Sequence, residues 1–536
     1  MKKRTLLTCG LAAALFAGCS SDDKLTVDDG TVSNGTGYVS LRIALPSTSG
    51  GMRANDQAND QYDEGDANEY KVNDVTLVFF NENKEVLSTH KLAGFSETGT
   101  DNNDGITVEH TLATQKVSGD ARFVLVLLNK PDAVKTDVAT FDKLNEAIDC
   151  SDVTTLTGTS YDKFFMSNTT LSDGTQSQTL VPITPKTTIA KAEANKAIVY
   201  VERAVGKVEM SHGTTNWSDW TYTIPTDAAV YAEDEITINQ WDIDLTNKKT
   251  YPVRKYDNSW SSITHNTYKR MLSSGAAYGG TWQRTYWAED PNYNVDAAGE
   301  LDDNPTFSSM TTKLYCLENT FDVKHMKQNN STRVLLKATY KPQGFNAGDT
   351  WYLLANSSTP KHESAILTAV QAVVHDVTIL NLPAGKTLKD NYQTSYFKKG
   401  SDDVSTDELT LIKNAISSIT KYDAGICYYA VRIQHFGSYY TPWGSETGAP
   451  IIPAGTGDAF YNYVTDTEGA DINTYYLGRY GIVRNNWYQL MLNSISAPGE
   501  PTIPTPADSP DDVTNYYISA TVKIMDWAVR KQSVNL

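Results

Sequence analysis

The residues of this sequence best placed for chemistry are sites at which the chain itself would be modified. Cys19 ends the run Phe16-Ala17-Gly18-Cys19, which closes a basic start and an apolar stretch from Leu6 to Gly18. That stretch is too short for a permanent membrane span, so it is interpreted as a signal peptide. Its ending is typical of a bacterial lipobox, with the usual Leu displaced to Leu15, and predicts lipid on Cys19. Ordinary signal cleavage beside a chance cysteine is the alternative.

The second site is Arg53, the only basic residue between Arg42 and Lys71. It lies in a segment from Ser47 to Glu69 that is rich in Ser, Gly, Asn and Asp and reads as disordered. A protease needs an extended and accessible segment, and this one offers it. An isolated arginine in a linker is common, so Arg53 alone is a weak signal.

Motifs for catalysis are missing from the sequence. It has no Gly-x-Ser-x-Gly elbow, no His-Glu-x-x-His helix, no Cys-x-x-Cys pair and no Walker loop. The eight histidines are dispersed, and none lies within four residues of another. Carboxylates paired as in a glycosidase stay open, because a sequence does not reveal their separation. We therefore predict no enzyme activity, no cofactor and no metal site.

The amino-acid composition limits the kinds of molecule that the protein is expected to bind. Lys and Arg number 46 against 64 Asp and Glu, which gives a net charge of −18 and argues against nucleic acid or anionic lipid as the main partner. The 31 Tyr and ten Trp favour β-structure. Beyond the leader only Cys150, Cys316 and Cys427 remain, too few and too scattered for a disulfide framework.

Two segments near opposite ends of the chain share one strand pattern. Residues 38–45 and 517–524 both alternate apolar and polar side chains at period two, as half-buried strands do. In the first, the apolar face consists of Val39, Leu41, Ile43 and Leu45. In the second it consists of Ile518, Ala520, Val522 and Ile524, followed in the opposite phase by Trp527 and Val529. This likeness suggests that the chain joins to copies of itself.

The chain is long enough for two or more domains. We expect a signal peptide with lipobox, a tether with a removable strand, an N-terminal β-sandwich, a larger C-terminal β-sandwich, and a C-terminal strand with donor tail. Their predicted limits are 1–19, 20–53, 54–196, 197–515 and 516–536. A capping box at Ser405 and Glu408 predicts a helix that presents Leu409, Ile412, Ile416 and Ile419 on one face.

The last 60 residues carry a resemblance to a known family. The tail from Tyr476 to Tyr488, followed by Pro498-Gly-Glu-Pro, Trp527-Ala528-Val529-Arg530 and the ending Gln532 to Leu536, resembles the major fimbrillins of type V pili. It is most similar to the minor-fimbria (short-fimbria) type of major subunit. The segment Val201 to Val208 resembles another recurrent stretch, with Gly206 where Ala is expected.

The resemblance implies an all-β fold with few short helices, built from two tandem transthyretin-like β-sandwiches. It implies a lipoprotein precursor in the outer membrane, held by lipid on Cys19, that ends in a cell-surface fimbrium and supports adhesion. An arginine-specific extracellular protease would cut between Arg53 and Ala54 and release the strand with Val39, Leu41, Ile43 and Leu45. A donor strand from another copy would replace it; its candidate residues are Ile518, Val522, Ile524, Trp527, Val529, Val534 and Leu536. Pilus anchor and tip subunits would be further partners.

Donor-strand exchange follows from the physics of the pattern as well. Each buried aliphatic side chain contributes about 1.5–3 kcal/mol, so losing four would open a strongly apolar groove flanked by unpaired backbone groups. A strand donated by a neighbouring subunit would fill the groove and pair with the exposed backbone groups. Because donor and groove are different surfaces, the contact is heterologous and builds an open filament.

Two other classes stay open. A surface-tethered glycan-binding lipoprotein would share the lipobox and β-domains, and a cluster of aromatic residues could stack on sugars, although packing is the commoner fate of such residues. The cluster consists of Tyr475, Tyr476, Tyr480, Trp487 and Tyr488. A hydrolase would need a catalytic pair or triad, which no spacing indicates. Because the chain has both a cut site and a donor, a shaft subunit is favoured over an anchor or a tip.

Overall fold

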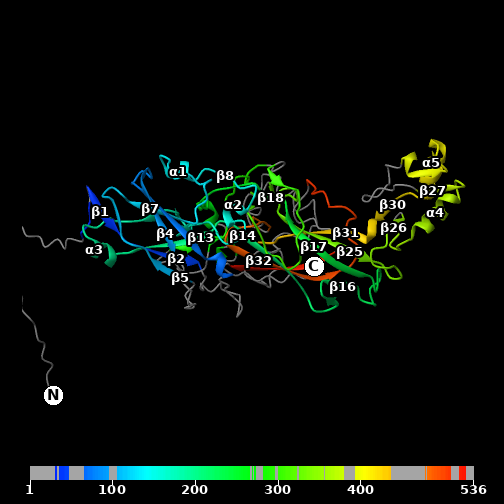
Figure 1. Cartoon of the computed structure of the whole chain (residues 1–536), viewed down its shortest axis with the longest axis horizontal. Coiled ribbons are helices and arrows are strands. Elements are labelled where there is room, and N and C mark those ends of the chain that lie inside the picture. The colour runs from blue at the N-terminus through cyan, green and yellow to red at the C-terminus, as the bar shows by residue number, and fades with distance from the viewer. Residues whose placement is uncertain are drawn as a thin grey trace, which may run out of the picture.

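A computed structural model gives the arrangement of most of the chain. It describes residues 30–32, 35–46, 65–95, 106–262, 264–265, 268–269, 271–272, 282–295, 300–322, 325–354, 357–379, 393–435, 477–478, 480–508 and 518–526. The described chain is elongated and consists of three successive parts along its long axis (Figure 1). Each part has a hydrophobic core of its own.

The N-terminal part is built around one curled sheet in the order β4-β3-β7-β9-β13-β2-β5, with β12 paired to β7 and a separate β1–β6 pair. Its strands are β1 (Thr36–Val39), β2 (Leu41–Pro46), β3 (Val72–Phe80), β4 (Val86–Phe95), β5 (Ile106–Thr111), β6 (Gln115–Ser118), β7 (Phe123–Leu128), β8 (Ile148–Asp149), β9 (Met166–Asn168), β10 (Leu171–Ser172), β11 (Ser177–Gln178), β12 (Val181–Pro182) and β13 (Ala197–Arg203). Its helices are η1 (Ala67–Glu69), α1 (Phe141–Leu144), α2 (Thr154–Thr157) and α3 (Ile189–Ala194).

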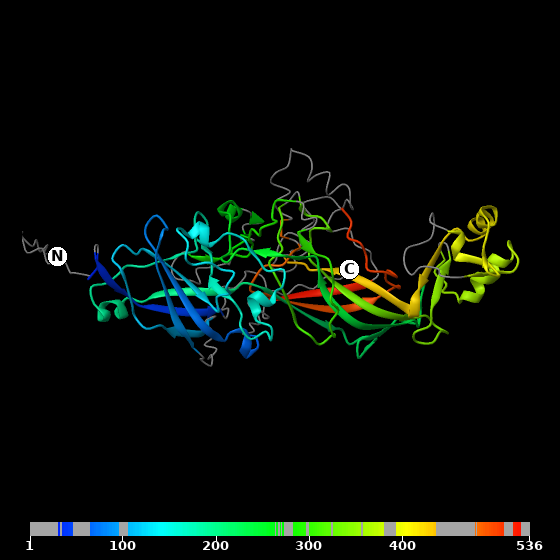
Figure 2. The same cartoon turned by 45° about the horizontal axis from the view of Figure 1, so that its top comes forward.

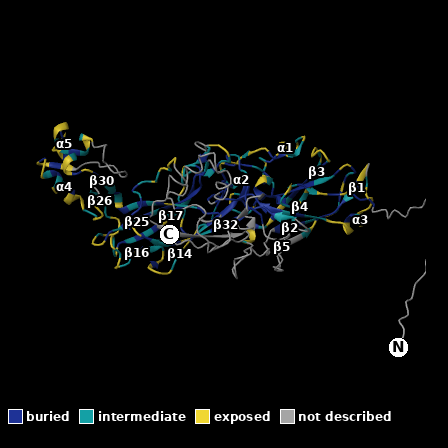
Figure 3. Cartoon of the chain, turned by 180° about the vertical axis from the view of Figure 1, so that it is seen from behind, coloured by how far each residue is buried: buried dark blue, intermediate teal, exposed yellow. Residues whose placement is uncertain are grey.

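The curl of this sheet brings its first and last strands together. Phe95 of β4 stacks on His110 of β5 with ring centroids 3.9 Å apart. The central strands β3 and β7 read as nearly continuous apolar runs because both of their faces are covered. The resulting core encloses buried side chains of β2, β3, β7, β9 and β13 (Figure 3).

The C-terminal part is a β-sandwich. A four-stranded sheet in the order β24-β14-β32-β33 faces a five-stranded sheet in the order β15-β16-β17-β25-β31. The two sheets pack around one core, with Leu490 from the first and Trp241 from the second both fully buried. The elements are β14 (Gly206–His212), β15 (Trp217–Ser218), β16 (Thr221–Thr223), β17 (Glu235–Asp244), β18 (Thr246–Asn247), β19 (Lys249–Thr250), η2 (Asn258–Ser262), β20 (Thr264–His265), β21 (Tyr268–Lys269), β22 (Gln283–Arg284), β23 (Leu301–Asp302), β24 (Leu314–Cys316), β25 (Arg333–Lys341), η5 (Asp423–Gly425), β31 (Ile426–Arg432), β32 (Asn486–Ile495) and β33 (Ile518–Asp526).

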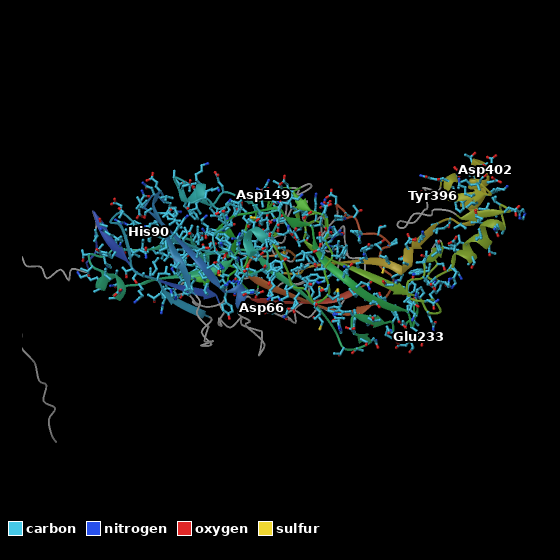
Figure 4. The ribbon with its side chains drawn as sticks, in the orientation of Figure 1. Asp66, His90, Asp149, Glu233, Tyr396 and Asp402 are labelled. Atoms are coloured by element: carbon cyan, nitrogen blue, oxygen red, sulfur yellow. The ribbon has the colours of Figure 1, made fainter. Side chains whose placement is uncertain are left out.

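A small lobe projects from the end of the sandwich that faces away from the N-terminal part (Figure 2). It consists of β26 (Trp351–Leu354), α4 (Glu363–Gln371), β27 (Val377–Ile379), η4 (Thr394–Tyr396), β28 (Phe397–Lys399), β29 (Asp402–Asp403), α5 (Thr406–Ala415) and β30 (Ile419–Tyr422). Chain enters and leaves it through β26 and β30, which pair with each other. Figure 4 shows Tyr396 and Asp402 of the lobe at the opposite end of the molecule from His90 in β4.

The capping box predicted for the lobe is confirmed. The Ser405 side chain accepts a hydrogen bond from the Glu408 amide, and the Glu408 carboxylate accepts one from the Ser405 amide. The predicted apolar face is buried, with Leu409, Ile412 and Ile416 in the lobe core. Ile419 belongs to the same core but lies in β30, beyond the helix end.

The all-β prediction with few short helices is also confirmed. The predicted start of the C-terminal sandwich at residue 197 stays a prediction, and the segment Ala197–Arg203 lies at this limit. This segment, β13, pairs with β2 and β9 and contributes Val199 and Val201 to the N-terminal core. The exact domain limits stay predictions, and the change from one core to the next falls between Val205 and Val208.

Candidate assembly site

The predicted removable strand occupies a slot between two other strands. β2 pairs in parallel with β13, where Leu41 lies opposite Ala197, and antiparallel with β5, where Ile43 lies opposite His110. Among the described residues, β5 pairs with no strand other than β2. Taking β2 out would therefore leave two strands with unpaired backbone groups facing each other.

The side chains predicted to fill this slot are all buried. Leu41 and Ile43 have no exposed surface, and Val39 and Leu45 are 4% and 2% exposed. All four belong to the N-terminal core together with Val199 and Val201 from the neighbouring β13. The alternation in the sequence therefore places a complete apolar face inside this core.

Backbone contacts extend the slot toward the free end of the N-terminal part. Tyr38 of β1 and Lys186 exchange two backbone hydrogen bonds of 2.8 and 2.9 Å. Gly37 lies so close to Pro185 that a Cβ atom there would be 2.7 Å from the proline Cβ. β1 and β2 together therefore fill one extended site.

The predicted donor region is described in part. Ile518, Val522 and Ile524 lie in β33, whose backbone pairs antiparallel with β32 of the same chain. Within the described part of the chain, β33 is the edge strand of its sheet. Its last residue, Asp526, lies opposite Asn486. The chain therefore leaves β33 at the boundary between the N-terminal and C-terminal parts.

The remaining predicted site residues lie outside the described residues. They are Cys19, Arg53, Ala54, Trp527, Val529, Val534 and Leu536. Lipidation, cleavage and the register of the donor therefore stay predictions. None of the helices in the described ranges has the length and apolar run needed to cross a bilayer.

A buried polar cluster, the waist cluster of Glu69, Arg203, Lys207 and Tyr315, joins the two parts. The Lys207 Nζ lies 2.7 Å from the Glu69 carboxylate, and the two side chains are 0% and 1% exposed. The Tyr315 hydroxyl donates a hydrogen bond to the same carboxylate. Arg203 Nε donates to the Glu69 backbone carbonyl at 2.7 Å. One residue from η1 thus holds strands on both sides of the boundary.

Burial has the largest effect on the pKa values of the waist cluster. It lowers the pKa of Lys207, because the charged ammonium loses solvation, although Glu69 acts in the opposite direction. It also raises the pKa of Tyr315 well above the usual value, with the Glu69 carboxylate adding to the shift. Removing one partner would leave an uncompensated buried charge, which is strongly destabilising.

Two further buried ion pairs lie beside the waist cluster. Arg254 contacts Glu202 of β13 at 2.7 Å, and Arg484 contacts Glu318 at 2.7 Å, with all four side chains at most 1% exposed. Arg254 Nη2 also donates to the Arg484 carbonyl at 3.3 Å, which links the two pairs. The boundary is therefore a packed polar interface.

Sequence reasoning missed this interface. The signal available was the run Val201 to Val208, in which Glu202, Arg203 and Lys207 interrupt apolar strand residues. Charged residues in such a run indicate buried pairs, because isolated buried charge is too costly. Their partners could not be found by spacing, since Glu69 and Arg254 lie far away in sequence.

The alternative site predicted from aromatic residues is not assembled as a sugar platform in the described residues. Tyr480, Trp487 and Tyr488 are at most 6% exposed, and Lys207 Nζ lies 3.8 Å from the centroid of the Trp487 ring. Tyr475 and Tyr476 lie outside the described residues. Within the described ranges, no group of His, Cys, Asp or Glu side chains is arranged to hold a metal ion.

Comparisons with known proteins match both ends of the chain. Residues 38–209 match the family model "Major fimbrial subunit protein (FimA)", and residues 456–533 match "Major fimbrial subunit protein type IV, Fimbrillin, C-terminal". The first match begins in β1 and ends in β14. No curated protein matches the chain.

Solved structures of similar proteins include a fimbrilin from Porphyromonas gingivalis, with 13% identity over 92% of this chain and 99% of that chain at a TM-score of 0.35. A candidate cell adhesion protein from Parabacteroides distasonis shares 14% identity over 92% and 99%, with a TM-score of 0.38. The tip fimbrial protein Mfa3 from Porphyromonas gingivalis shares 10% over 92% and 100%, with a TM-score of 0.34. The likeness to fimbrial subunits rests on the two family models. Over residues 38–209 and 456–533, the chain is therefore similar to the fimbrillins, the major fimbrial subunit proteins.

Proposed function

We propose that this chain is the shaft subunit of a short-fimbria type pilus and polymerises by donor-strand exchange. As a fimbrial subunit it is a structural component of a cell-surface filament. The observation that supports exchange is the position of β2, which lies between β13 and β5 and precedes the proposed cut. A protease that cuts after Arg53 would break the backbone connection between β2 and β3, so that only non-covalent contacts would hold β2 in its sheet.

The energetics favour replacement over an empty slot. At about 1.5–3 kcal/mol for each buried aliphatic side chain, the four slot residues together contribute roughly 6–12 kcal/mol before entropy costs. An emptied slot would also expose two facing strand edges, and such edges pair with other strands. In the uncut chain β2 fills the slot, so the precursor cannot polymerise. Cleavage is therefore the proposed switch.

The test begins with the cut. An arginine-specific protease should convert the purified precursor into filaments visible by electron microscopy, and Arg53→Ala should remain a monomer. Arg53→Lys is the matched control, since it keeps the charge but removes the arginine that the protease recognises. Cleavage after Arg53 that yields only monomers would contradict the proposal, as would filaments from Arg53→Ala at the normal rate.

The donor has two candidate extents, the tail from Trp527 to Leu536 alone or that tail together with β33. In the register of β33 on β32, Thr521 lies opposite Met491, whose side chain is 38% exposed. A disulfide between Met491→Cys and Thr521→Cys would keep β33 on its own sheet. If β33 is donated, the oxidised variant should not polymerise until a reductant is added. If the tail suffices, oxidised and reduced samples should polymerise alike.

We also propose that the precursor is an outer-membrane lipoprotein anchored through Cys19. The lipobox-like ending of the leader supports this. Cells fed a labelled fatty acid should label the natural chain, and Cys19→Ser should be unlabelled and absent from the membrane fraction. Equal labelling of both chains would exclude Cys19 as the acceptor. The arginine-specific protease and the anchor and tip subunits are the further proposed partners, and absence of enzyme activity stays a prediction.

A further inference from the structure

The slot and the donor region are connected by one stretch of backbone. β13 pairs with β2 in the slot, and β14 pairs in parallel with β32, on which β33 lies. Only Ala204 and Val205 separate β13 from β14. The two strands lie in line along the long axis of the molecule (Figure 1).

The link between β13 and β14, here called the crossing, consists of Ala204 and Val205 and is hydrogen-bonded to both parts of the molecule. The Ala204 amide donates to the Phe165 carbonyl of the N-terminal part at 3.0 Å. The Val205 carbonyl accepts from the Asn485 amide of the C-terminal part at 2.8 Å. Gly206 then passes so close to Ile482 that an added Cβ would be 2.5 Å from its side chain.

Glu69 fastens both flanks of this crossing. Its backbone carbonyl accepts from Arg203, one residue before the crossing, and its carboxylate pairs with Lys207, just after it. Asp66, in the same turn, pairs with Lys313 at 2.9 Å. In Figure 4, Asp66 lies near the middle of the molecule, where the N-terminal part meets the C-terminal sandwich.

We propose that residues 197–212 form a spine that transmits tension through the subunit, with Glu69 as its lock. The proposal rests on the proposed function, in which one neighbour pulls on the slot and the other on the C-terminal donor. Tension that enters at β2 passes to β13 and along the continuous backbone to β14 and β32. Force along a strand loads the hydrogen bonds of a ladder together, whereas force across it breaks them one at a time.

The contacts of Glu69 determine which part of the subunit gives way first under tension. Without Glu69, the boundary would keep the Arg254–Glu202 and Arg484–Glu318 pairs but lose the residue that joins both flanks of the crossing, and the two cores would separate at lower force. With Glu69 holding both flanks, the weakest element is the strand in the slot, which is held by non-covalent contacts alone. The subunit therefore stays intact until a slot strand leaves.

A single-molecule pulling experiment on the uncut chain tests the spine without requiring filaments. Azide-bearing amino acids at Arg42, in β2, and at Ile503, on the arm that follows β32, provide the handles. Ile503 is 39% exposed, and Arg333 fixes the adjacent Pro504 carbonyl with a 2.6 Å hydrogen bond. Under constant force, the natural chain should first show a short extension from release of β2, with both cores still folded.

Lys207→Met should open the waist before β2 leaves, with a lifetime under force at least about tenfold shorter. Glu69→Gln, which keeps the side-chain volume, should act in the same direction if Lys207→Met folds poorly. Lys143→Ala, which removes an exposed ion pair with Glu146, is the control and should behave like the natural chain. The spine is overturned if a core of the natural chain unfolds before β2 leaves. It is also overturned if both lock variants match the control. Because the uncut monomer is used, failure to form filaments would not affect this result.

Discussion

β2 and β33 have nearly the same alternating sequence and are held in different ways. β2 lies between two strands, and its whole apolar face is inside the N-terminal core. β33 pairs along one edge only in the described chain, with β32. The alternation of a strand therefore indicates which apolar groove its side chains can fill. Its position in the sheet determines how it can dissociate. A strand in a slot needs a cut, whereas a strand at an edge can detach.

The largest effect should come from the slot itself. Leu41→Ala in the uncut chain should lower the free energy of unfolding by about 2–5 kcal/mol, because the side chain is fully buried and leaves a cavity. Urea denaturation of the Arg53→Ala background provides the measurement. Leu87→Ala on β4 is the control, since Leu87 is 38% exposed and its loss should cost no more than about 0.5 kcal/mol. Equal costs would show that β2 is not held by its apolar face.

The boundary between the two regions should be nearly as sensitive. Gly206→Ala should cost about 1–3 kcal/mol, because its Cβ would overlap the Ile482 side chain. Gly213→Ala is the matched control, since the nearest atom to its Cβ would be 3.6 Å away. Thermal unfolding of both variants separates the two outcomes. A Gly206→Ala variant as stable as Gly213→Ala would show that Ile482 moves aside freely.

Hydrogen exchange should distinguish the two strands directly. Amides of β33 should exchange at least about tenfold faster than those of β2 in the uncut monomer, because an edge strand opens with the loss of one ladder only. Mass spectrometry of peptides covering residues 38–46 and 518–526 gives the comparison. Equal protection would indicate that β33 is fastened by contacts beyond β32 and would favour the tail alone as the donor.

The smallest effect should be the contribution of one buried carboxyl group of the C-terminal part, Asp242, to the pH dependence of stability. Burial raises the pKa of Asp242 to about 6, above its ordinary value of 3.8. The folded chain therefore holds this proton more tightly than the unfolded chain, and the stability contributed by Asp242 should fall as pH rises from about 4 to 6. Asp290, with its pKa raised by burial to about 7, acts in the same direction.

Urea denaturation at pH 5 and pH 7 measures this dependence. Asp242→Asn should make the slope shallower, and Asp227→Asn, an exposed change of the same charge, should leave it unchanged. A slope that is identical in all three chains would remove Asp242 as a cause.

Local pattern was enough to predict the strands and the capped helix. The alternation at Val39 to Leu45 identified a buried face, and Ser405 with Glu408 marked where α5 begins. Local pattern did not identify β2 and β9 as the partners of β13, because a strand shows which faces are apolar but not which neighbours it pairs with. The waist cluster could not be predicted for the same reason, since Glu69 and Lys207 come into contact only after both parts of the chain have folded.

The lobe is attached through two neighbouring strands, which makes it a suitable place to insert another domain. Because β26 and β30 pair with Leu354 opposite Ile419, the chain between them is an excursion that starts and ends at neighbouring positions. A compact foreign domain with neighbouring termini could replace this excursion without altering the slot, the spine or β33. If the subunits polymerise as proposed, such a chimera would display its cargo once per subunit, at a regular spacing along the fibre.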